Sequence, residues 1–433
     1  MSEKFDVIIV GAGPAGNAAA YTLAKAGLKV LQLERGEYPG SKNVQGAILY
    51  ANSLERIIPD FREHAPLERH LIEQRMWMME ENSFFGAHYR SEEFNTTPGN
   101  RYTIIRARFD KWFSEQAQSA GALLICEMTV KSLLRNEQGR VIGVEIERED
   151  GKIYADAVIL ADGVNSLLAT RAGLRSDIKP DHVALAVKEM IFLPRETIEA
   201  RFNLSGLGGV AIEMLGSITA GMVGTGFLYT NKDSLSIGVG GMLGDMRAQK
   251  LTPYELLEKM KAHPSIAPLI AGGETREYAA HLLPEGGYKA LPQLYGDGWL
   301  MVGDSAGFVN SVHREGSNLA MESGRMAAET LIELLQAGQA PSAANLARYQ
   351  AKLDESFVMK DMKKYRNVPE TLHTQRQFIN DYPLLFNGAA HRFFTVDGRD
   401  KQSKEKEIVA TFVKRRSLFG LLGDAFKLWR ATR

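Results

Sequence analysis

A glycine motif near the amino terminus constrains the fold of this chain more than any other feature. An apolar run, Phe5-Asp-Val-Ile-Ile-Val10, leads into Gly11-Ala-Gly-Pro-Ala-Gly16, and a helix-forming run extends from Ala15 to Lys25. This order of strand, glycine turn and helix is the context in which such a motif binds a dinucleotide. The alternative is a glycine turn in an unrelated α/β unit.

Each glycine of the motif has a separate expected role. Gly11 permits the tight turn, Gly13 lets the backbone approach a pyrophosphate, and Gly16 lets the helix pack closely on its strand. The amino terminus of the helix then offers free N–H groups and a favourable dipole to the phosphate. A second strand, 28–33, ends at Glu34, where an acid accepts a bond from a ribose 2′-OH. Because a carboxylate repels a 2′-phosphate, we expect a cofactor other than NADP.

Two further strand-to-turn junctions lie far along the chain. Ala157-Val-Ile-Leu160 runs into Ala161-Asp-Gly-Val-Asn-Ser166, and Leu300-Met-Val-Gly-Asp304-Ser-Ala-Gly-Phe308 is a strand followed by a glycine turn. The region from Trp299 to Leu335 has the pattern of strand, turn and helix. The first and last motifs together predict FAD, held across nearly the whole fold.

Composition sets the outer bounds. The 433 residues suffice for two or three domains, and the hydrophobic fraction of 45% and charged fraction of 24% are ordinary for a globular protein. The formal net charge of zero gives no global field that favours nucleic acid. The single cysteine, Cys126, excludes a disulfide framework or a cysteine-ligated cluster within the chain, and the nine histidines lack metal-ligand spacing. Only Met1–Lys4 precede the first strand, so we expect no signal peptide and a cytoplasmic location.

The pattern along the chain predicts an α/β protein with interleaved domains. We expect an FAD-binding domain at residues 1–75, 101–180 and 295–335, a mixed β-sheet substrate domain at 76–100 and 181–294, and a helical region at 336–433. Residues 183–290 alternate strand-like runs with turns and contain one helix, 253–262. Helices are also expected at 51–58 and from 106 to near 121, and strands at 123–126, 129–135, 141–147, 152–154 and 157–160.

Several motifs resemble a known family. Arg106-x-x-Phe-Asp-x-Trp112, Asp162-Gly163 and Gly303-Asp304, with the opening fingerprint, resemble the glutathione-reductase-type FAD fold in its hydroxylase and geranylgeranyl-reductase branch. More narrowly, the chain is similar to electron-transfer flavoprotein:quinone oxidoreductases, and to their FixC (EtfC) subgroup from nitrogen-fixing bacteria. That similarity rests on Ser41-Lys-Asn-Val-Gln-Gly46, Ala161-Asp-Gly-Val-Asn-Ser166, Gly224-Thr-Gly-Phe-Leu-Tyr-Thr-Asn231 and Gly303-Asp-Ser-Ala-Gly-Phe-Val-Asn310.

The resemblance implies a set of FAD contacts. Arg106 would reach the phosphate or ribityl region, and Asp304 would accept bonds from the ribityl chain or the pyrophosphate shell. Gly316 and Asn318, at the start of a helix, would face the flavin pyrimidine, where N–H groups stabilise the negative charge of a reduced flavin. The full implied set is Gly11, Gly13, Pro14, Ala15, Gly16, Glu34, Arg35, Lys42, Asn43, Val44, Gln45, Gly46, Arg106, Val130, Ala161, Asp162, Gly163, Gly303, Asp304, Gly316, Ser317 and Asn318.

Some of these assignments have plain structural alternatives. Arg106 is also compatible with a surface helix arginine, and 42–46 and 316–318 with ordinary connecting loops. His313, beside Arg314, is placed to tune a flavin or to act as a structural histidine.

The route of electrons follows from a missing second nucleotide motif. Gly206-Leu-Gly-Gly209 and Gly238-Val-Gly-Gly241 lack the following helix and the downstream acid of a fingerprint. We therefore expect electrons from another protein rather than directly from NADH. The resemblance implies an FAD-dependent, quinone-reducing subunit of a FixABCX-like electron-bifurcating complex that delivers low-potential electrons for nitrogen fixation. The alternatives are a geranylgeranyl-reductase-like double-bond reductase and a flavin-bearing scaffold without turnover.

The carboxyl-terminal tail is basic and amphipathic. Residues 399–433 contain ten Lys or Arg and four Asp or Glu, a local net charge of +6. At 100° per residue, one arc of the last helix is apolar: Leu418, Phe419, Leu421, Leu422, Ala425, Phe426, Leu428 and Trp429. This pattern predicts a helix lying in the inner surface of the cytoplasmic membrane. The alternative is a terminal helix docked on this protein or on a partner.

The implied partners follow from the same resemblance. They are the electron-transfer flavoprotein-like subunits FixA and FixB, quinone, and a small ferredoxin-like subunit, FixX. A [4Fe–4S] cluster needs about four thiolates. Because this chain has only Cys126, expected on a strand, we expect FixX to supply the cluster. The alternative is direct transfer from a donor flavin without iron.

Overall fold

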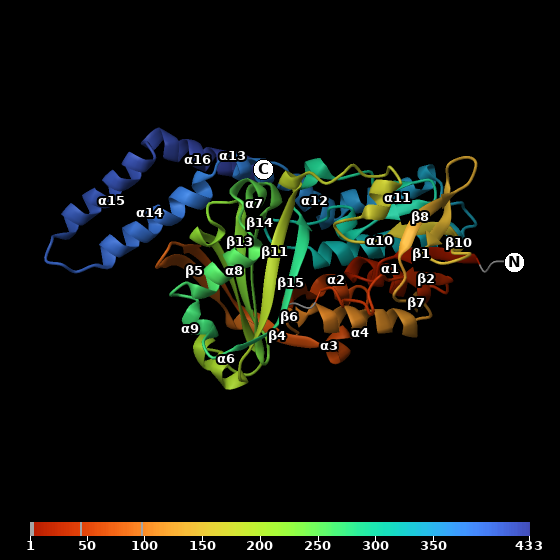
Figure 1. Cartoon of the computed structure of the whole chain (residues 1–433), viewed down its shortest axis with the longest axis horizontal. Coiled ribbons are helices and arrows are strands. Elements are labelled where there is room, and N and C mark those ends of the chain that lie inside the picture. The colour runs from red at the N-terminus through yellow and green to blue at the C-terminus, as the bar shows by residue number, and fades with distance from the viewer. Residues whose placement is uncertain (1–3, 44–45, 97) are drawn as a thin grey trace. The chain divides into compact units, whose positions relative to one another are not determined.

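The computed structural model describes residues 4–43, 46–96 and 98–433, and they form two compact units (Figure 1). Unit 1 comprises Met1–Glu68, Asn100–Val183 and Leu282–Lys364, and unit 2 comprises Arg69–Gly99, Ala184–His281 and Tyr365–Arg433. The sequence-based division instead set 336–433 apart as a helical region. In the structure, the first part of that region belongs to unit 1, whose core includes Leu346 and Tyr349, and the part from Tyr365 onward belongs to unit 2.

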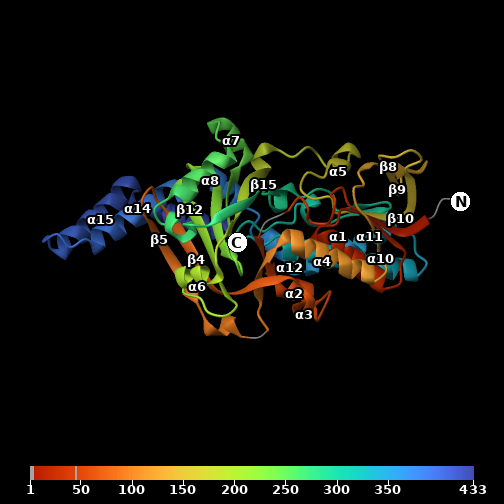
Figure 2. The ribbon, with the colours of Figure 1, turned by 60° about the horizontal axis from the view of Figure 1, so that its bottom comes forward.

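A predominantly parallel sheet forms the centre of unit 1. Its neighbouring strands are, in order, β16 (Tyr295–Gly296), β17 (Trp299–Met301), β10 (Lys152–Leu160), β1 (Lys4–Val10), β2 (Val30–Leu33) and β7 (Leu123–Ile125). Val10 of β1 pairs with Leu160 on one side and with Leu33 on the other. β8 (Val130–Arg135) and β9 (Val141–Ile146) continue from β10 as an antiparallel pair (Figure 2). The central strands are mostly apolar because both faces of a parallel sheet are covered.

The helices of unit 1 pack around this sheet and against one another. They are α1 (Pro14–Lys25), α2 (Ala51–Glu55), α3 (Phe61–His64), α4 (Arg106–Ser119), α5 (Leu167–Arg171), α10 (Ser317–Gln336), α11 (Ala343–Glu355) and α12 (Phe357–Lys364). α1 and α10 approach so closely that a Cβ on Gly324 would lie 2.1 Å from the Ala15 carbonyl oxygen. A short pair, β3 (Gly46–Tyr50) and β6 (Arg101–Ile105), leads into α4.

Unit 2 is built on a mixed sheet. Its strands are β15 (Glu274–Pro284), β11 (Val183–Phe192), β14 (Ser234–Met242), β13 (Gly224–Thr230), β12 (Gly208–Gly216), β4 (Leu67–Met79) and β5 (Phe84–Arg90), in that order of neighbours. β12 and β4 are parallel, whereas β11–β14, β14–β13, β13–β12 and β4–β5 are antiparallel. One face carries an apolar core that includes Val187, Ile212, Leu228 and Ile237.

The helices of unit 2 fall into two groups. α6 (Arg195–Phe202), α7 (Leu243–Gln249), α8 (Pro253–Ala262) and α9 (Ala267–Ile270) lie between strands in the sequence. α13 (Val368–Thr374), α14 (Gln377–Phe394), α15 (Lys401–Arg415) and α16 (Leu418–Ala431) form the carboxyl-terminal part. α14 and α15 lie side by side as a hairpin (Figures 1 and 2).

Several sequence expectations were wrong in detail. Residues 183–290 contain four α-helices rather than one, because α6, α7 and α9 are too short to show a clear helical period. The expected strands 152–154 and 157–160 form the single strand β10, and the expected helix 51–58 ends at Glu55. Cys126 follows β7 rather than lying in it.

Candidate functional site

The carboxyl ends of neighbouring parallel strands converge at one edge of the unit 1 sheet. The Gly11 amide donates to the Leu33 carbonyl at 2.8 Å, and the Ala161 amide donates to the Val10 carbonyl at 2.9 Å. The Val302 amide donates to the Leu160 carbonyl at 3.0 Å. The three glycine turns predicted from the sequence therefore meet at the edge where parallel α/β sheets bind their ligands.

The first turn requires glycine at two positions for reasons internal to the fold. Gly11 has φ +107°, and a Cβ there would lie 2.3 Å from the Ala161 carbonyl oxygen. A Cβ on Gly16 would lie 2.1 Å from the Gly11 carbonyl oxygen. Neither position accepts a larger side chain without moving backbone.

Gly13 differs from its neighbours in the motif. It caps α1 with extended backbone (φ −80°, ψ −174°), and a Cβ on it would meet no protein atom within 4 Å. No side chain caps the helix, whose first residue is Pro14. Packing within the protein does not explain glycine at this position. The turn instead fits a cofactor whose pyrophosphate needs close access to the amino end of α1.

Glu34 has two bonds to the backbone of the surrounding turns. Its Oε2 accepts from the Ala12 amide at 2.9 Å and its Oε1 from the Gly36 amide at 2.6 Å. These bonds place the carboxylate beside the glycine turn, where the ribose role expected for it stays a prediction. They also give Glu34 a structural role that the sequence did not reveal.

Two supporting residues were missed from the sequence. Asn17 donates to the Ala12 carbonyl at 3.0 Å, and Gln32 donates to the Gly11 carbonyl at 3.1 Å and to Asn17 Oδ1 at 2.9 Å. Both side chains are fully buried. The sequence did contain one signal for this role, since Gln32 is a polar residue in an otherwise apolar strand. A buried amide needs hydrogen-bond partners, so such a residue is expected to bond to a neighbouring turn.

Arg175 joins the other two turns and was also missed. Its Nη1 donates to the Val164 carbonyl and to the Ser305 carbonyl, each at 3.0 Å. The link connects the Asp162-Gly163 turn to the Gly303-Asp304 turn, with Ser305 lying 130 residues beyond Arg175 in the sequence. Nothing in the sequence around Arg175 distinguishes it from a surface arginine.

Asp162 is an acid with a perturbed charge in this cluster. Burial raises the pKa of Asp162 to about 6, although a hydrogen bond from Ser166 (3.0 Å) and the charge of Arg175 oppose the shift. The next residue, Gly163, has φ +80°, which lets the chain turn away from the sheet. The turn thus holds a carboxyl group that changes charge close to neutral pH.

Arg106 is held by a carboxylate within its own helix. It donates from Nε to Asp110 Oδ1 at 2.9 Å and from Nη2 to Oδ2 at 2.8 Å. The Asp110 side chain is fully buried, and the Arg106 charge also interacts with Asp304. Arg106 is therefore not a free surface arginine, and its contact with the cofactor stays a prediction.

The amino end of α10 carries two buried amides with unused hydrogen-bonding atoms. Asn318 donates to Glu315 at 2.9 Å, yet its Oδ1 has no partner; Asn310 accepts from the amides of Val312 and His313, yet its Nδ2 has none. Both residues are at most 5% exposed. A buried donor and a buried acceptor left without partners fit a polar ring edge such as the flavin pyrimidine.

The remaining expected contacts are placed as follows. Ser317 donates to the Ile48 carbonyl at 3.2 Å, and Gly46 pairs with Ile105 directly before α4. Arg35 and Lys42 are exposed, whereas Asn43 is partly buried. Val130 begins β8 and packs against the core. Val44 and Gln45 lie outside the described residues.

Gly303 and Ala15 also meet in this region. Gly303 has φ +60°, and a Cβ on it would lie 2.9 Å from the Ala15 Cβ. The Gly303 amide donates to Ser323 Oγ of α10 at 3.0 Å. The last glycine motif is thus fixed against both α1 and α10.

The tail helix α16 docks with its polar face inward. Asp424 is 1% exposed and accepts hydrogen bonds from Arg416 (2.6 Å), Gln377 (2.9 Å) and Tyr382 (3.0 Å). Lys427 donates to Gln375 at 2.7 Å. The expected apolar arc faces outward, with these exposed fractions: Leu418 63%, Phe419 88%, Leu422 70%, Phe426 58%, Leu428 45% and Trp429 50%.

The described residues contain neither a candidate metal site nor a helix that could span a membrane. Within 4–43, 46–96 and 98–433, no group of His, Cys, Asp or Glu side chains could hold a metal ion. Over the same residues, every helix is too short or too polar to cross a bilayer.

Comparison with known proteins agrees with the geometry of the site. Residues 4–199 match the FAD binding domain family, and residues 368–433 match the ETF-QO/FixC family C-terminal domain. The described fold resembles a geranylgeranyl bacteriochlorophyll reductase-like protein from Thermoplasma acidophilum, with a TM-score of 0.72 at 20% identity, covering 95% of this chain and 99% of that one. This structural likeness shows the fold.

Whole-length relatives show the family. Protein FixC from Azotobacter vinelandii is 63% identical over 431 residues, covering 100% of both chains. Protein FixC from Escherichia coli K12 is 42% identical and covers 99% of both. A probable electron transfer flavoprotein-quinone oxidoreductase, YdiS, from the same organism is 42% identical over 98% of both. With its convergent glycine turns and these relatives, the chain belongs to the FixC family of FAD-dependent oxidoreductases.

Proposed function

We propose that this protein is the quinone-reducing flavin subunit of a FixABCX-like electron-bifurcating complex that supplies low-potential electrons for nitrogen fixation. The observation that supports this most directly is the cradle of three glycine turns together with a carboxyl-terminal part, 368–433, of the ETF-QO/FixC type. The fold alone does not separate the FixC role from a double-bond reductase. The whole-length similarity to FixC proteins favours electron transfer.

When bound, FAD supplies the capacity to accept and release electrons one or two at a time. The residues of this chain bind and orient it. The backbone at Gly11–Gly16 and the amino end of α1 would hold the pyrophosphate, and Glu34 would hold the adenosine ribose. The amino end of α10, with Asn310 and Asn318, would face the pyrimidine, where donors stabilise negative charge.

The proposed partners are FixA and FixB as electron donors, quinone as acceptor and FixX as the carrier of an iron–sulfur cluster. The single cysteine of the chain supports a separate cluster subunit, because thiolate ligands must come from elsewhere. Iron analysis of the isolated chain should give none. A reduced native complex should show a cluster signal at low temperature that copurifies with a cysteine-rich small subunit, and an active complex without iron would rule out this division of labour.

The test of the proposed activity is flavin reoxidation by quinone in the assembled complex. The reduced complex should transfer electrons to a soluble ubiquinone analogue, whereas a geranylgeranylated substrate should leave the flavin reduced. Reoxidation by the isoprenoid double bond would favour the reductase alternative. If neither acceptor reoxidises the flavin, the scaffold alternative gains support. Asn318→Ala, matched by Asn367→Ala outside the cradle, would show whether the amino end of α10 sets the rate.

We also propose that α16 attaches the protein peripherally to the inner face of the cytoplasmic membrane. Its outward apolar face and the basic residues Lys414 and Arg430 suit an anionic lipid surface. Removing the chain after Val413 should weaken flotation with anionic vesicles and leave FAD bound, and added salt should have part of the same effect. Unchanged flotation would favour a helix that serves only a protein contact.

A further inference from the structure

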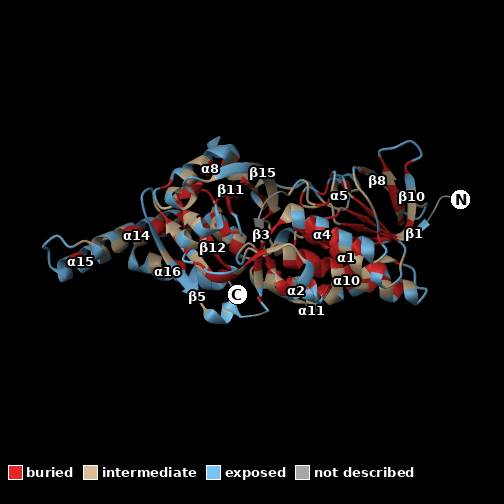
Figure 3. Ribbon diagram, turned by 90° about the horizontal axis from the view of Figure 1, so that it is seen from below, coloured by how far each residue is buried: buried red, intermediate tan, exposed pale blue. Residues whose placement is uncertain are grey.

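The turn between α14 and α15, together with the end of α14, presents exposed apolar side chains that lie outside α16. Phe393 is 50% exposed, Phe394 76% and Val396 87%, all within four residues. The two phenyl rings meet edge to face, with centroids 5.3 Å apart. Figure 3 shows the adjoining helix α15 mostly in the pale blue of exposed residues. We call Phe393, Phe394 and Val396 the hairpin tip.

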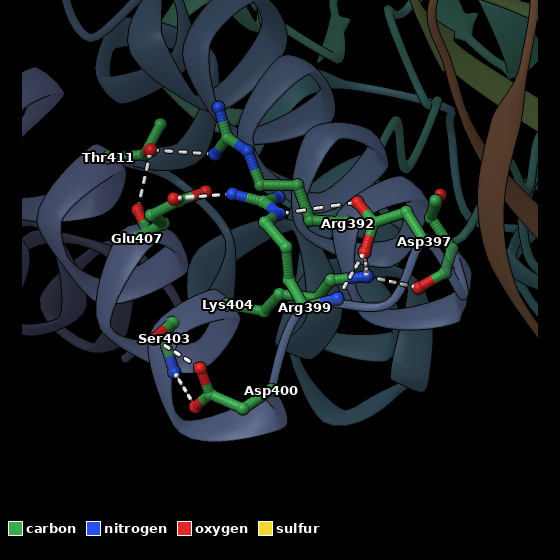
Figure 4. Close-up of polar contacts among 9 residues, drawn as sticks. Arg392, Asp397, Arg399, Asp400, Ser403, Lys404, Glu407 and Thr411 are labelled. Atoms are coloured by element: carbon green, nitrogen blue, oxygen red, sulfur yellow. Dashed lines mark hydrogen bonds and ion pairs between the residues drawn. The ribbon is translucent and has the colours of Figure 1, made fainter.

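Ion pairs and hydrogen bonds hold the same turn together, with Lys404 buried beneath the exposed Asp397 and Arg399 (Figure 4). Lys404, whose side chain is 2% exposed, forms an ion pair with Asp397 at 2.6 Å and donates to the Thr395 carbonyl. Arg399 donates to Asp397 at 3.3 Å and to Glu407 at 2.7 Å. Burial of the Lys404 side chain while Phe393 and Phe394 are exposed reverses the usual placement of charged and apolar groups.

Further contacts fix both helix ends beside the turn. Asp400 caps α15 by accepting from the Ser403 amide at 2.8 Å. Arg392 near the end of α14 donates to Thr411 of α15 at 2.7 Å. The hairpin tip is therefore presented on an ordered support, and its exposure does not come from a loosely held loop.

The charge around the tip suits an anionic surface, and the long cationic side chains suit a lipid one. Asp397 and Glu407 are neutralised by Lys404 and Arg399, and Asp400 is used as a cap. Lys401 and Lys406 remain exposed, against Glu405. Long cationic side chains beside apolar ones can reach lipid phosphates while the apolar groups enter the acyl region.

The shape of the element also suits lipid. The tip is the convex end of a helical hairpin, and the views of Figures 1 and 2 agree that no other element of unit 2 lies beside it. Most of the backbone polar groups behind it are satisfied within α14 and α15, so insertion exposes little unpaired backbone to hydrocarbon. A protein groove would need a partner of matching concave form, whereas a bilayer accepts a convex apolar end of any outline.

We propose that the hairpin tip is a second lipid-inserting element, which enters an anionic bilayer beside or together with the outward face of α16. The proposal rests on the peripheral membrane role proposed above for α16. It adds an insertion point more than twenty residues earlier in the chain. Two contacts with lipid, rather than one, would restrict how unit 2 is oriented on the membrane.

The experiment uses the full-length holoprotein with an environment-sensitive fluorophore on Val396→Cys in a Cys126→Ser background. Vesicles of phosphatidylcholine with phosphatidylglycerol should shift the emission to the blue, and acyl-chain-brominated lipids should quench it. A matched label on Leu207→Cys, at a position 49% exposed in unit 2, should respond to neither. Phe394→Ser combined with Val396→Ser should lower the vesicle partition coefficient about tenfold, whereas Leu207→Ser should leave it unchanged.

The outcomes separate this proposal from the one for α16. If Phe419→Ser with Leu422→Ser abolishes flotation while the label at 396 never responds to lipid, the tip proposal is overturned and the role of α16 stands. If the wild-type protein does not bind vesicles at all, both fall. A blue shift that grows with protein concentration in the absence of vesicles would assign the tip to a second copy of this chain and would also overturn the lipid assignment.

Discussion

Glycines that look alike in the sequence carry different constraints in the structure. Gly11 and Gly16 are required by neighbouring backbone, whereas a Cβ on Gly13 would meet no protein atom. The motif predicted all three from the sequence, and the expected role of each follows from general geometry. What the sequence could not give is the space around each glycine, which the structure shows to be closed by backbone at Gly11 and Gly16 and open at Gly13.

This difference predicts opposite results for two valine substitutions. Gly13→Val should fold with nearly the wild-type melting temperature but lose FAD, because the side chain would occupy the approach of the pyrophosphate. Gly16→Val should destabilise the apoprotein by about 1–3 kcal/mol or more, since it must displace backbone. Thermal unfolding of the two apoproteins and their flavin absorbance would check this. If the two variants showed the same decrease in melting temperature, Gly13 would have a structural role as well.

The raised pKa of Asp162 predicts a pH dependence of stability. The pKa is about 6 in the folded protein and about 3.9 in an unfolded chain. Between these values the folded state binds more protons, so the apoprotein should gain stability as the pH falls from 7 to 5. With partial exposure taken into account, the gain should be on the order of 1 kcal/mol. Asp162→Asn should remove this slope, and an unchanged slope would assign the effect to other groups.

At the scale of elements, periodicity predicted long helices well and short ones poorly. α4 and α8 lie within two residues of the expected bounds, whereas α6, α7 and α9 were missed because their four to eight residues make about two turns at most. The amphipathic arc of α16 was visible in the sequence, but its direction was not. Only the structure shows that Asp424 faces inward, since its partners Gln377 and Tyr382 are more than forty residues away.

Asp424 should control how firmly α16 docks. Although burial alone raises the pKa of Asp424, the hydrogen bonds from Arg416, Gln377 and Tyr382 outweigh it and lower the pKa. A lowered pKa means that the stabilisation is present above the unfolded value of about 3.9 and is lost as the pH falls through the lower folded value. Asp424→Asn should therefore increase amide exchange in α16 at pH 7. Its melting-temperature difference from the wild type should persist at pH 5 and shrink only below about pH 4.

At the scale of the whole molecule, the FAD fold could be predicted because its motifs are local, each a strand with the turn that follows it. The links between motifs could not be predicted in this way. Arg175 bonds to a turn 130 residues further along the chain, and Asn310 and Asn318 show unused atoms only once their burial is known. Links of this kind are tertiary contacts, which leave no periodic pattern in the sequence.

The purified chain should be yellow and should release FAD rather than FMN on denaturation, because the glycine turn and Glu34 serve the adenosine half of the cofactor. Reduced nicotinamide should bleach the flavin of the isolated chain only slowly, since no second fingerprint is present in the sequence. Stopped-flow absorbance would measure the rate. Fast bleaching by NADH alone would contradict the proposed electron route, and release of FMN would contradict the cofactor geometry.

The crossing of α1 and α10 has a mechanical consequence. Gly324 of α10 lies so close to the Ala15 carbonyl of α1 that an added side chain would have to push the two helices apart. Such a substitution would also change the distance between their amino ends. Because these are the two helix ends proposed to face the cofactor, a change made at Gly324 would be felt at both ends of the flavin nucleotide without any contact of its own.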